Sequence, residues 1–373
     1  MRTTAVPFTF SSWIRRSLSG LSRAGWRRQA MCYVLGLVLL VRFRSIREIA
    51  TRLANGAVDT LHHFAHDSPW QEETVERAQQ EAIGKRARRH RAATRLILDD
   101  TPFEREGKNI EGLGVHHGAK GLVKGLCAVT AVVRIGKQVW CWAIRGYRPK
   151  RGCPPGTFRS KIELALEVLE QAALLGANVF VLMDAWYSCK RVLNRIAWQG
   201  WRYVAAIKSN RRLRLEGRKT LVRFLAKGPR TYRTVRLSKR LTVRVARREA
   251  VLPGVGPVAV FIVKAKEWVS FLVSNDLELT PQEAVRLYAE RFRIETFHRD
   301  AKQHLGLGEL WVRSWRAVQR HWTLCGLAYN ALLYWELSQH HRRRPFGQII
   351  RAFREEVSLS EVVRWHQRLI RVA

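Results

Sequence analysis

The spacing of apolar residues changes at residue 94, and this change constrains the fold more than any other feature. Before it, apolar residues recur at helical spacing. After it, short apolar runs and amphipathic helices follow in the order β-β-β-α-β-α-β. Such an order is typical of an α/β protein with a mixed sheet. We therefore expect a helical N-terminal region followed by an α/β core.

The expected elements divide the chain into five segments. A strand-rich insertion interrupts the α/β rhythm, because its apolar residues alternate and it contains two Pro-Gly or Gly-Pro turns. The expected segments are a helical domain over 1–92, the first part of the core over 93–207, the insertion over 208–268, the second part of the core over 269–335, and a helical tail over 336–373.

The chain is strongly basic, with 67 Lys and Arg against 30 Asp and Glu and a formal net charge of +37. Its 47% apolar residues exclude a disordered basic tail. The insertion is especially basic, with 15 Lys and Arg and two acids over 211–250. Nucleic acid is therefore the expected partner. No membrane span is expected, because the longest apolar run covers 12 residues, 30–41, and a span needs about 20.

The N-terminal segment has the order helix, short turn, helix. Ser45 and Glu48 have capping-box spacing, and Asn55-Gly56 marks a turn before a short helix over 57–66. This order fits a helix-turn-helix that presents Thr60, His62 and His63 to a DNA groove, and it also fits an ordinary three-helix packing unit. A basic cluster that follows fits either a phosphate-binding surface or a solvated helix face: Lys85, Arg86, Arg88, Arg89 and Arg91.

Three acidic residues are placed to carry chemistry. Asp99 follows a strand-like run over 94–98, Asp184 follows the apolar strand 179–183, and Glu295 lies in a helix expected over 281–303. Carboxylate oxygens suit Mg²⁺, and two such ions can serve the attacking and the leaving oxygen of a phosphodiester reaction. Each aspartate alone is also explained as a turn former at a strand end.

Four residues of the expected helix share one face: Tyr288, Arg291, Glu295 and Lys302. At about 100° per residue they form a stripe roughly 60° wide. Such a stripe could place a metal ligand beside groups that bind phosphates. A solvated face with an Arg291–Glu295 ion pair has the same spacing.

The same four residues have the spacing Y-(2)-R-(3)-E-(6)-K, which is the motif of bacterial insertion-sequence transposases with a DDE triad. The sequence resembles that family over roughly 30–335. Asp99-Asp100-Thr101 resembles its D-x-T motif, and Asp184-Ala-Trp-Tyr resembles its second Asp motif. The D-x-T spacing favours Asp99, with Asp100 as the alternative. The resemblance implies an RNase H-like core with a β insertion.

The resemblance also implies a cut-and-paste transposase, which cleaves DNA at transposon ends and transfers the strands into target DNA. Asp99, Asp184 and Glu295 would bind two Mg²⁺ ions, with Mn²⁺ as a substitute. Tyr288, Arg291 and Lys302 would bind phosphates. The implied partners are the terminal inverted repeats, the target DNA and a second copy of the chain in a homodimer. Trp268 is a candidate for stacking a flipped base, although a core position explains it as well.

Two other kinds of protein remain as alternatives. One is a catalytically inactive or domesticated sequence-specific DNA-binding protein, against which the intact acids argue. The other is a structure-selective nuclease of the same fold, against which the four-residue stripe and the basic insertion argue. A bacterial cytoplasmic protein, bound at the nucleoid, is expected in each case. Six scattered cysteines without paired spacing fit that reducing compartment.

Overall fold

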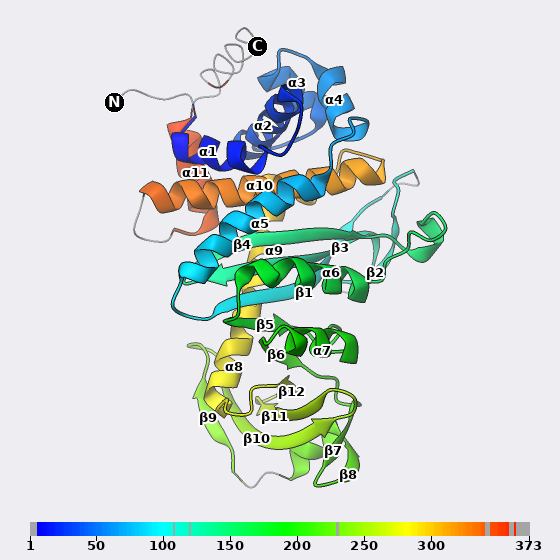
Figure 1. The fold of residues 1–373 in the computed structure, drawn as a ribbon, viewed down its shortest axis with the longest axis vertical. Coiled ribbons are helices and arrows are strands. Elements are labelled where there is room, and N and C mark those ends of the chain that lie inside the picture. The colour runs from blue at the N-terminus through cyan, green and yellow to red at the C-terminus, as the bar shows by residue number, and fades with distance from the viewer. Residues whose placement is uncertain are drawn as a thin grey trace.

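The computed structural model describes residues 6–106, 109–118, 121–228, 231–339, 344–357 and 362. Among these residues, twelve strands form one mixed sheet with helices on both faces. The molecule is elongated: helices gather at one end, the α/β core lies in the middle, and the strands of the insertion lie at the other end (Figure 1). The predicted mixed α/β class is therefore confirmed.

The N-terminal region is helical, as predicted. Ser45 begins its third helix, and the Ser45 hydroxyl accepts a hydrogen bond from the Glu48 backbone N–H at 3.1 Å. Asn55 and Gly56 have positive φ angles of 51° and 77°, which make the turn to the next helix. The helices are α1 (Phe8–Ser17), α2 (Ala24–Leu39), α3 (Ile46–Leu53), α4 (Val58–His66) and α5 (Glu72–Arg89).

The central part of the sheet has the strand order β4-β3-β1-β5-β6. β1 pairs antiparallel with β3, and β3 with β4, whereas β5 and β6 run parallel to β1. This arrangement is consistent with an RNase H-like fold. The strands are β1 (Thr94–Glu104), β2 (Gly114–Gly118), β3 (Gly121–Ile135), β4 (Gln138–Tyr147), β5 (Val179–Met183) and β6 (Arg202–Ala206).

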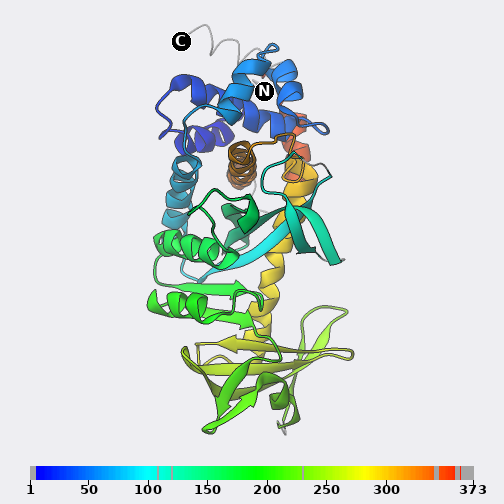
Figure 2. The same ribbon diagram turned by 90° about the vertical axis from the view of Figure 1, so that its right-hand side faces the viewer.

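Helices cover both faces of this sheet (Figure 2). On one face lie α6 (Lys161–Gln171) and α7 (Lys190–Trp198). On the opposite face lie α8 (Pro281–Ala289) and α9 (Arg293–Leu305), and α9 runs along β1 and β3. Reciprocal capping boxes begin α6, at Ser160 and Glu163, and α8, at Thr280 and Glu283.

The basic insertion forms strands that extend the core sheet. The strand that follows the insertion, β12, pairs antiparallel with both β11 and the core strand β6, so the insertion is hydrogen-bonded to the core. The elements of this region are β7 (Arg212–Leu215), β8 (Arg218–Leu221), η3 (Val222–Lys227), β9 (Arg233–Arg236), β10 (Thr242–Leu252), β11 (Gly256–Lys264) and β12 (Val269–Ser274).

Two further helices follow the core, α10 (Trp315–Gln339) and α11 (Phe346–Glu356). α10 buries Trp322 and Trp335 between the sheet and the N-terminal helices. In the expected helical tail, residues 340–343, 358–361 and 363–373 lie outside the described residues. Within the described part of the chain, no helix combines the length and apolar character needed to cross a membrane.

Candidate active site

Asp99 and Asp184 lie side by side on adjacent parallel strands. β1 and β5 pair from Thr94 with Val179 to Leu98 with Met183, so the next residue of each chain segment is Asp99 and Asp184. The expected end of β1 at residue 98 is wrong. β1 continues to Glu104, because its second half pairs with β3. Asp99 is therefore held within a strand, and not in a flexible turn.

The side chains of Asp99 and Asp100 point to opposite faces of the sheet, as strand geometry requires. Asp99 Oδ2 accepts a hydrogen bond from Arg291 Nη1 at 2.6 Å, on the face covered by α9. Asp100 faces α6, where its carboxylate accepts from Lys161 Nζ at 2.6 Å and from Tyr187 Oη at 3.0 Å. Only Asp99 therefore lies on the side of Glu295.

Arg291 stands between two of the predicted metal ligands. Its Nη1 donates to Asp99, and its Nη2 donates to Glu295 Oε1 at 2.8 Å. The Arg291 side chain is 12% exposed, whereas that of Glu295 is 50% exposed. The guanidinium thus joins a buried acid to an acid at the surface.

The expected continuous helix over 281–303 is wrong, because a 3₁₀ turn, η4 (Glu290–Phe292), separates α8 from α9. A 3₁₀ turn has three residues per turn, so it rotates the residues before it relative to those after it. The straight stripe is broken, yet Arg291 still lies 5.9 Å from the centre of the Tyr288 ring. The break places Arg291 at the junction of the two helices, opposite the end of β5.

The carboxylates of Asp99 and Asp184 are only partly neutralised by nearby positive charge. The pKa of Asp99 is raised to about 7, mainly by burial and also by the neighbouring Asp184 carboxylate, while Arg291 opposes both effects. Burial also raises the pKa of Asp184, against the backbone N–H groups of Tyr187 and Trp186. These groups donate to Asp184 Oδ1 at 3.3 and 2.9 Å. Two partly buried carboxylates close together favour a bound cation.

The donor set fits a hard divalent cation, because carboxylate oxygens are the ligands that Mg²⁺ prefers. Within the described residues, however, no three His, Cys, Asp or Glu side chains are grouped closely enough to hold a metal ion. The physical reason is Arg291, which lies between Asp99 and Glu295 and bonds to both. The acids therefore have suitable donor atoms, but Asp99 and Glu295 are each bonded to Arg291 in this structure.

Lys302 is engaged with β1. Its Nζ donates to Thr101 Oγ1 at 2.7 Å and to the Pro102 carbonyl at 2.9 Å. A second contact between α9 and the sheet joins His298 Nε2 and Thr130 Oγ1 at 2.6 Å. The first contact fixes α9 to β1, which carries Asp99, and the second fixes it to the neighbouring strand β3. Phosphate binding by Lys302 stays a prediction.

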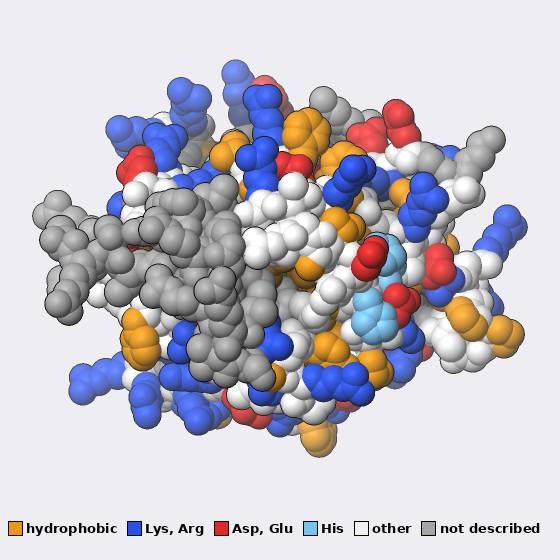
Figure 3. Space-filling view, turned by 90° about the horizontal axis from the view of Figure 1, so that it is seen from above, with side chains coloured by type: hydrophobic (Ala, Val, Ile, Leu, Met, Phe, Trp, Pro, Cys, Tyr) orange, Lys and Arg blue, Asp and Glu red, His pale blue; other side chains and the backbone are white. Residues whose placement is uncertain are grey.

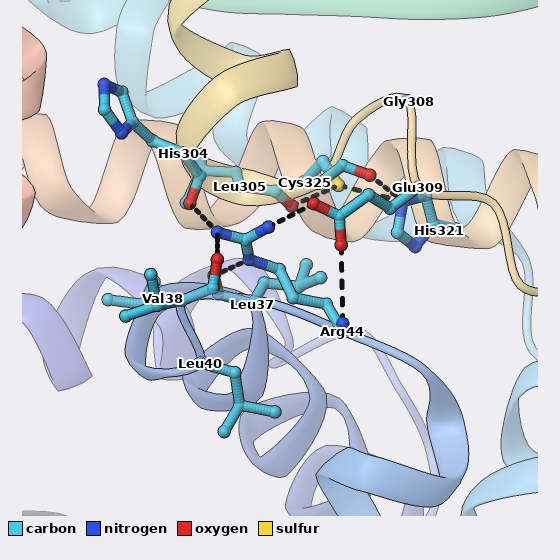
Figure 4. Close-up of polar contacts among 12 residues, drawn as sticks. Leu37, Val38, Leu40, Arg44, His304, Leu305, Gly308, Glu309, His321 and Cys325 are labelled. Atoms are coloured by element: carbon cyan, nitrogen blue, oxygen red, sulfur yellow. Dashed lines mark hydrogen bonds and ion pairs between the residues drawn. The ribbon is translucent and has the colours of Figure 1, made fainter.

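The far end of α9 is fixed by Arg44, which sequence reasoning missed (Figure 4). Arg44 follows α2 and is only 2% exposed. Its guanidinium donates to the carbonyls of Leu37 at 3.2 Å and His304 at 3.0 Å, and it pairs with Glu309. The N-terminal helices are thereby attached to the end of the helix that carries Glu295. No local pattern marks a buried arginine of this kind.

A pocket of about 680 Å³ opens beside Asp184. Trp186 lines it and is 52% exposed, and Lys208 Nζ lies 5.3 Å from the centre of its ring. Arg211 and Arg212 also line the pocket. Sequence reasoning considered only Trp268 for stacking, although Trp186 lies within the second Asp motif. Trp268 is 45% exposed in the turn between β11 and β12, so it is not a core residue.

The predicted groove-facing residues of α4, Thr60, His62 and His63, are all exposed. Two exposed acidic residues accompany them, Asp59 in the first turn of α4 and Asp67 directly after its last residue. Figure 3 shows acidic side chains next to the histidines, within a surface that carries many Lys and Arg side chains. The basic cluster from Lys85 to Arg91 is exposed as well. Groove binding by α4 stays a prediction.

Comparison with models of protein families gives a match over residues 17–251 to a family described as DDE superfamily endonuclease. The chain belongs to this family. The match covers more than half of the chain and includes Asp99 and Asp184, but it ends before α8 and α9. Membership indicates an enzyme that cleaves phosphodiester bonds, uses a divalent metal and acts on DNA. A search of curated proteins gives no match.

Proposed function

We propose that the protein is a DDE transposase of a bacterial insertion sequence, which cuts DNA at the ends of its element and joins them to target DNA. The observation that carries this proposal is the adjacency of Asp99, within β1, and Asp184, directly after the parallel strand β5, with Arg291 connecting Asp99 to Glu295. Family membership supports nuclease chemistry, and the Y-(2)-R-(3)-E-(6)-K spacing supports the transposase in particular.

The proposed ligands of the metal are Asp99, Asp184 and Glu295. When bound, two Mg²⁺ or Mn²⁺ ions would supply an activated attacking oxygen and stabilise the leaving oxygen. Asp99 is preferred to Asp100, because Asp100 faces α6 and is engaged by Lys161 and Tyr187.

The proposed phosphate-binding residues are Tyr288, Arg291 and Lys302. Arg291 lies in the 3₁₀ turn before α9, Lys302 lies on α9 with Glu295, and both side chains already bond to β1. On this proposal, the contacts to β1 place the charged groups of Arg291 and Lys302 next to the phosphodiester bond that is cut. Binding of a DNA phosphate then positions that bond over the acids.

The proposed partner is DNA, both at the terminal inverted repeats and at the target, and the proposed assembly is a homodimer that brings two ends together. The pocket beside Asp184 supports a contact to an unpaired nucleotide. Trp186 offers a ring for a base, and Lys208, Arg211 and Arg212 offer positive charge for its phosphates.

A strand-transfer assay tests this function. Labelled duplexes with the DNA that borders the gene are incubated with the protein, Mg²⁺ and a supercoiled plasmid, with Asp184→Ala as the inactive control. We expect cleavage at one border position and covalent joining of the label to the plasmid. Cutting of branched DNA without joining would instead indicate a structure-selective nuclease. Tight binding without cleavage would indicate a DNA-binding protein without catalysis.

A further inference from the structure

Arg291 is held by the acids of the site and does not face outward toward a ligand. Its two terminal nitrogens bond to different carboxylates, Asp99 at 2.6 Å and Glu295 at 2.8 Å. These acids lie on β1 and α9, so one side chain connects the sheet to the helix. A guanidinium is always charged, and its planar fork matches two oxygens at once. Arg291 therefore supplies the positive charge that a metal would otherwise supply.

The third nitrogen of the same group is unsatisfied. Arg291 Nε is buried and has no hydrogen-bond partner among the described residues. The Phe292 ring centre lies 4.9 Å from the Arg291 guanidinium carbon. Phe292 is 54% exposed, so the guanidinium lies near the solvent. An unpaired buried donor is costly, and it indicates a missing acceptor. The guanidinium is thus only partly satisfied by the two acids.

We propose that Arg291 is an exchangeable counter-ion: it holds Asp99 and Glu295 apart in the free protein, and it releases them when a DNA phosphate accepts its fork. This inference rests on the proposed function and concerns the regulation of the same site. It means that DNA opens the metal site, so that metal binding and DNA binding reinforce each other.

The reason is that the Arg291 guanidinium and a divalent metal ion compete for the same carboxylates. Arg291 takes up a lone pair of one oxygen on each carboxylate, and a divalent ion bound beside it would repel the guanidinium. Arg291 cannot lose its charge, so leaving the acids without a new anion is unfavourable. A phosphate provides that anion and can also accept from Nε. By linkage, DNA must then tighten metal binding by the same factor by which metal tightens DNA binding.

The test measures Mn²⁺ binding to the full-length protein by the EPR signal of free Mn²⁺. Titrations are made with and without a duplex that carries the DNA bordering the gene, and DNA alone is subtracted. For the wild type we expect weak binding, which DNA tightens by about 5–150-fold, the usual range of such coupling. For Arg291→Gln we expect tight binding without DNA and little further effect of DNA.

Two variants control for changes in folding. Arg134→Gln removes an ion pair with Glu290 at 2.7 Å, in the same 3₁₀ turn, without touching the acids, so it should bind Mn²⁺ as the wild type does. Arg291→Lys keeps the charge but loses the fork. It should remain weak without DNA, so tight binding by this variant would contradict the proposal. If Arg291→Gln does not fold, the effect of DNA on Mn²⁺ binding by the wild type carries the test.

The outcomes separate the two proposals. If Arg291→Gln binds Mn²⁺ no more tightly than the wild type while Asp184→Ala loses binding, the proposed role of Arg291 as an exchangeable counter-ion is wrong, and the proposed metal site is supported. If DNA does not change the Mn²⁺ affinity of the wild type, the exchange is also wrong. If Asp184→Ala binds Mn²⁺ like the wild type, the proposed metal site itself is wrong.

Discussion

Substitution of the two adjacent aspartates separates catalysis from stability. Asp100→Asn should lower the free energy of unfolding and keep DNA cleavage. Asp99→Asn should abolish cleavage without lowering that free energy. The two side chains lie one residue apart on β1 but face opposite sides of the sheet, so each is a matched control for the other.

The magnitude for Asp100 follows from its contacts. Its carboxylate accepts hydrogen bonds from Lys161 at 2.6 Å and Tyr187 at 3.0 Å, and the Asp100 and Lys161 side chains are only 17% and 16% exposed. An asparagine keeps an acceptor for Tyr187 but loses the charge opposite Lys161. A hydrogen bond to a charged group contributes about 1.5–3 kcal/mol, so we expect a loss of about 2 kcal/mol.

Asp99 should behave differently. Its pKa is raised to about 7, above the ordinary value of 3.8, so the folded protein disfavours its ionised form. At pH 8 the carboxylate is ionised in both states, and its removal relieves this cost. Arg291 keeps its bond to Glu295 after the substitution. We therefore expect the free energy of unfolding of Asp99→Asn to equal or exceed that of the wild type.

Urea unfolding followed by tryptophan fluorescence, at pH 8 with EDTA, measures the free energy of unfolding of both variants. Mg²⁺-dependent cleavage of a labelled duplex measures their activity. Loss of cleavage in Asp100→Asn with unchanged stability, together with active but destabilised Asp99→Asn, would show that the two roles are reversed.

Three further predictions concern DNA binding and pH. Trp186→Ala should weaken binding to border DNA by about 5–150-fold, because stacking contributes about 1–3 kcal/mol per base. Substitution of the exposed Trp198 by Ala should leave the affinity unchanged. Equal affinities of the two variants in fluorescence-anisotropy titrations would contradict the stacking role of Trp186. DNA affinity should fall steeply between about 50 and 200 mM salt, and a flat dependence would exclude binding dominated by phosphate contacts. Burial, with Lys302 and Arg291 nearby, lowers the pKa of His298 to about 3. Because unfolded His298 takes up a proton near its ordinary value of 6.5, its contribution to stability is complete above that pH and is lost as pH falls toward 3. His298→Gln should reduce this acid sensitivity in urea unfolding at pH 7 and 5, and an unchanged difference between the two pH values would refute it.

Local patterns were sufficient to predict the main elements. Ser45 was recognised as a helix cap, and the strand before Asp184 was recognised from five consecutive apolar residues. These features depend on residues within one turn or one strand. Within β1, strand alternation places the Asp99 and Asp100 side chains on opposite sides of the sheet, in agreement with their contacts.

The features that sequence could not predict depend on distant contacts. β1 extends to Glu104 because β3 pairs with it. The 3₁₀ turn at Glu290–Phe292 allows Arg291 to reach Asp99, 192 residues away. The pairing of β12 with β6, which joins the insertion to the core, likewise has no local signal. Spacing alone therefore indicated the Arg291–Glu295 ion pair as one interpretation, but it did not indicate the second bond of Arg291, to Asp99.

The most direct test of the central claim is Mg²⁺-dependent cleavage of a labelled duplex carrying the border DNA, by the wild type, Asp184→Ala and Glu295→Gln. Glu295 matters most, because the family match ends before it. Asp276→Asn, an acid paired with Arg202 away from the site, is the control. We expect cleavage by the wild type and the control only. Cleavage that survives in Asp184→Ala or Glu295→Gln would contradict a catalytic site built on Asp99, Asp184 and Glu295.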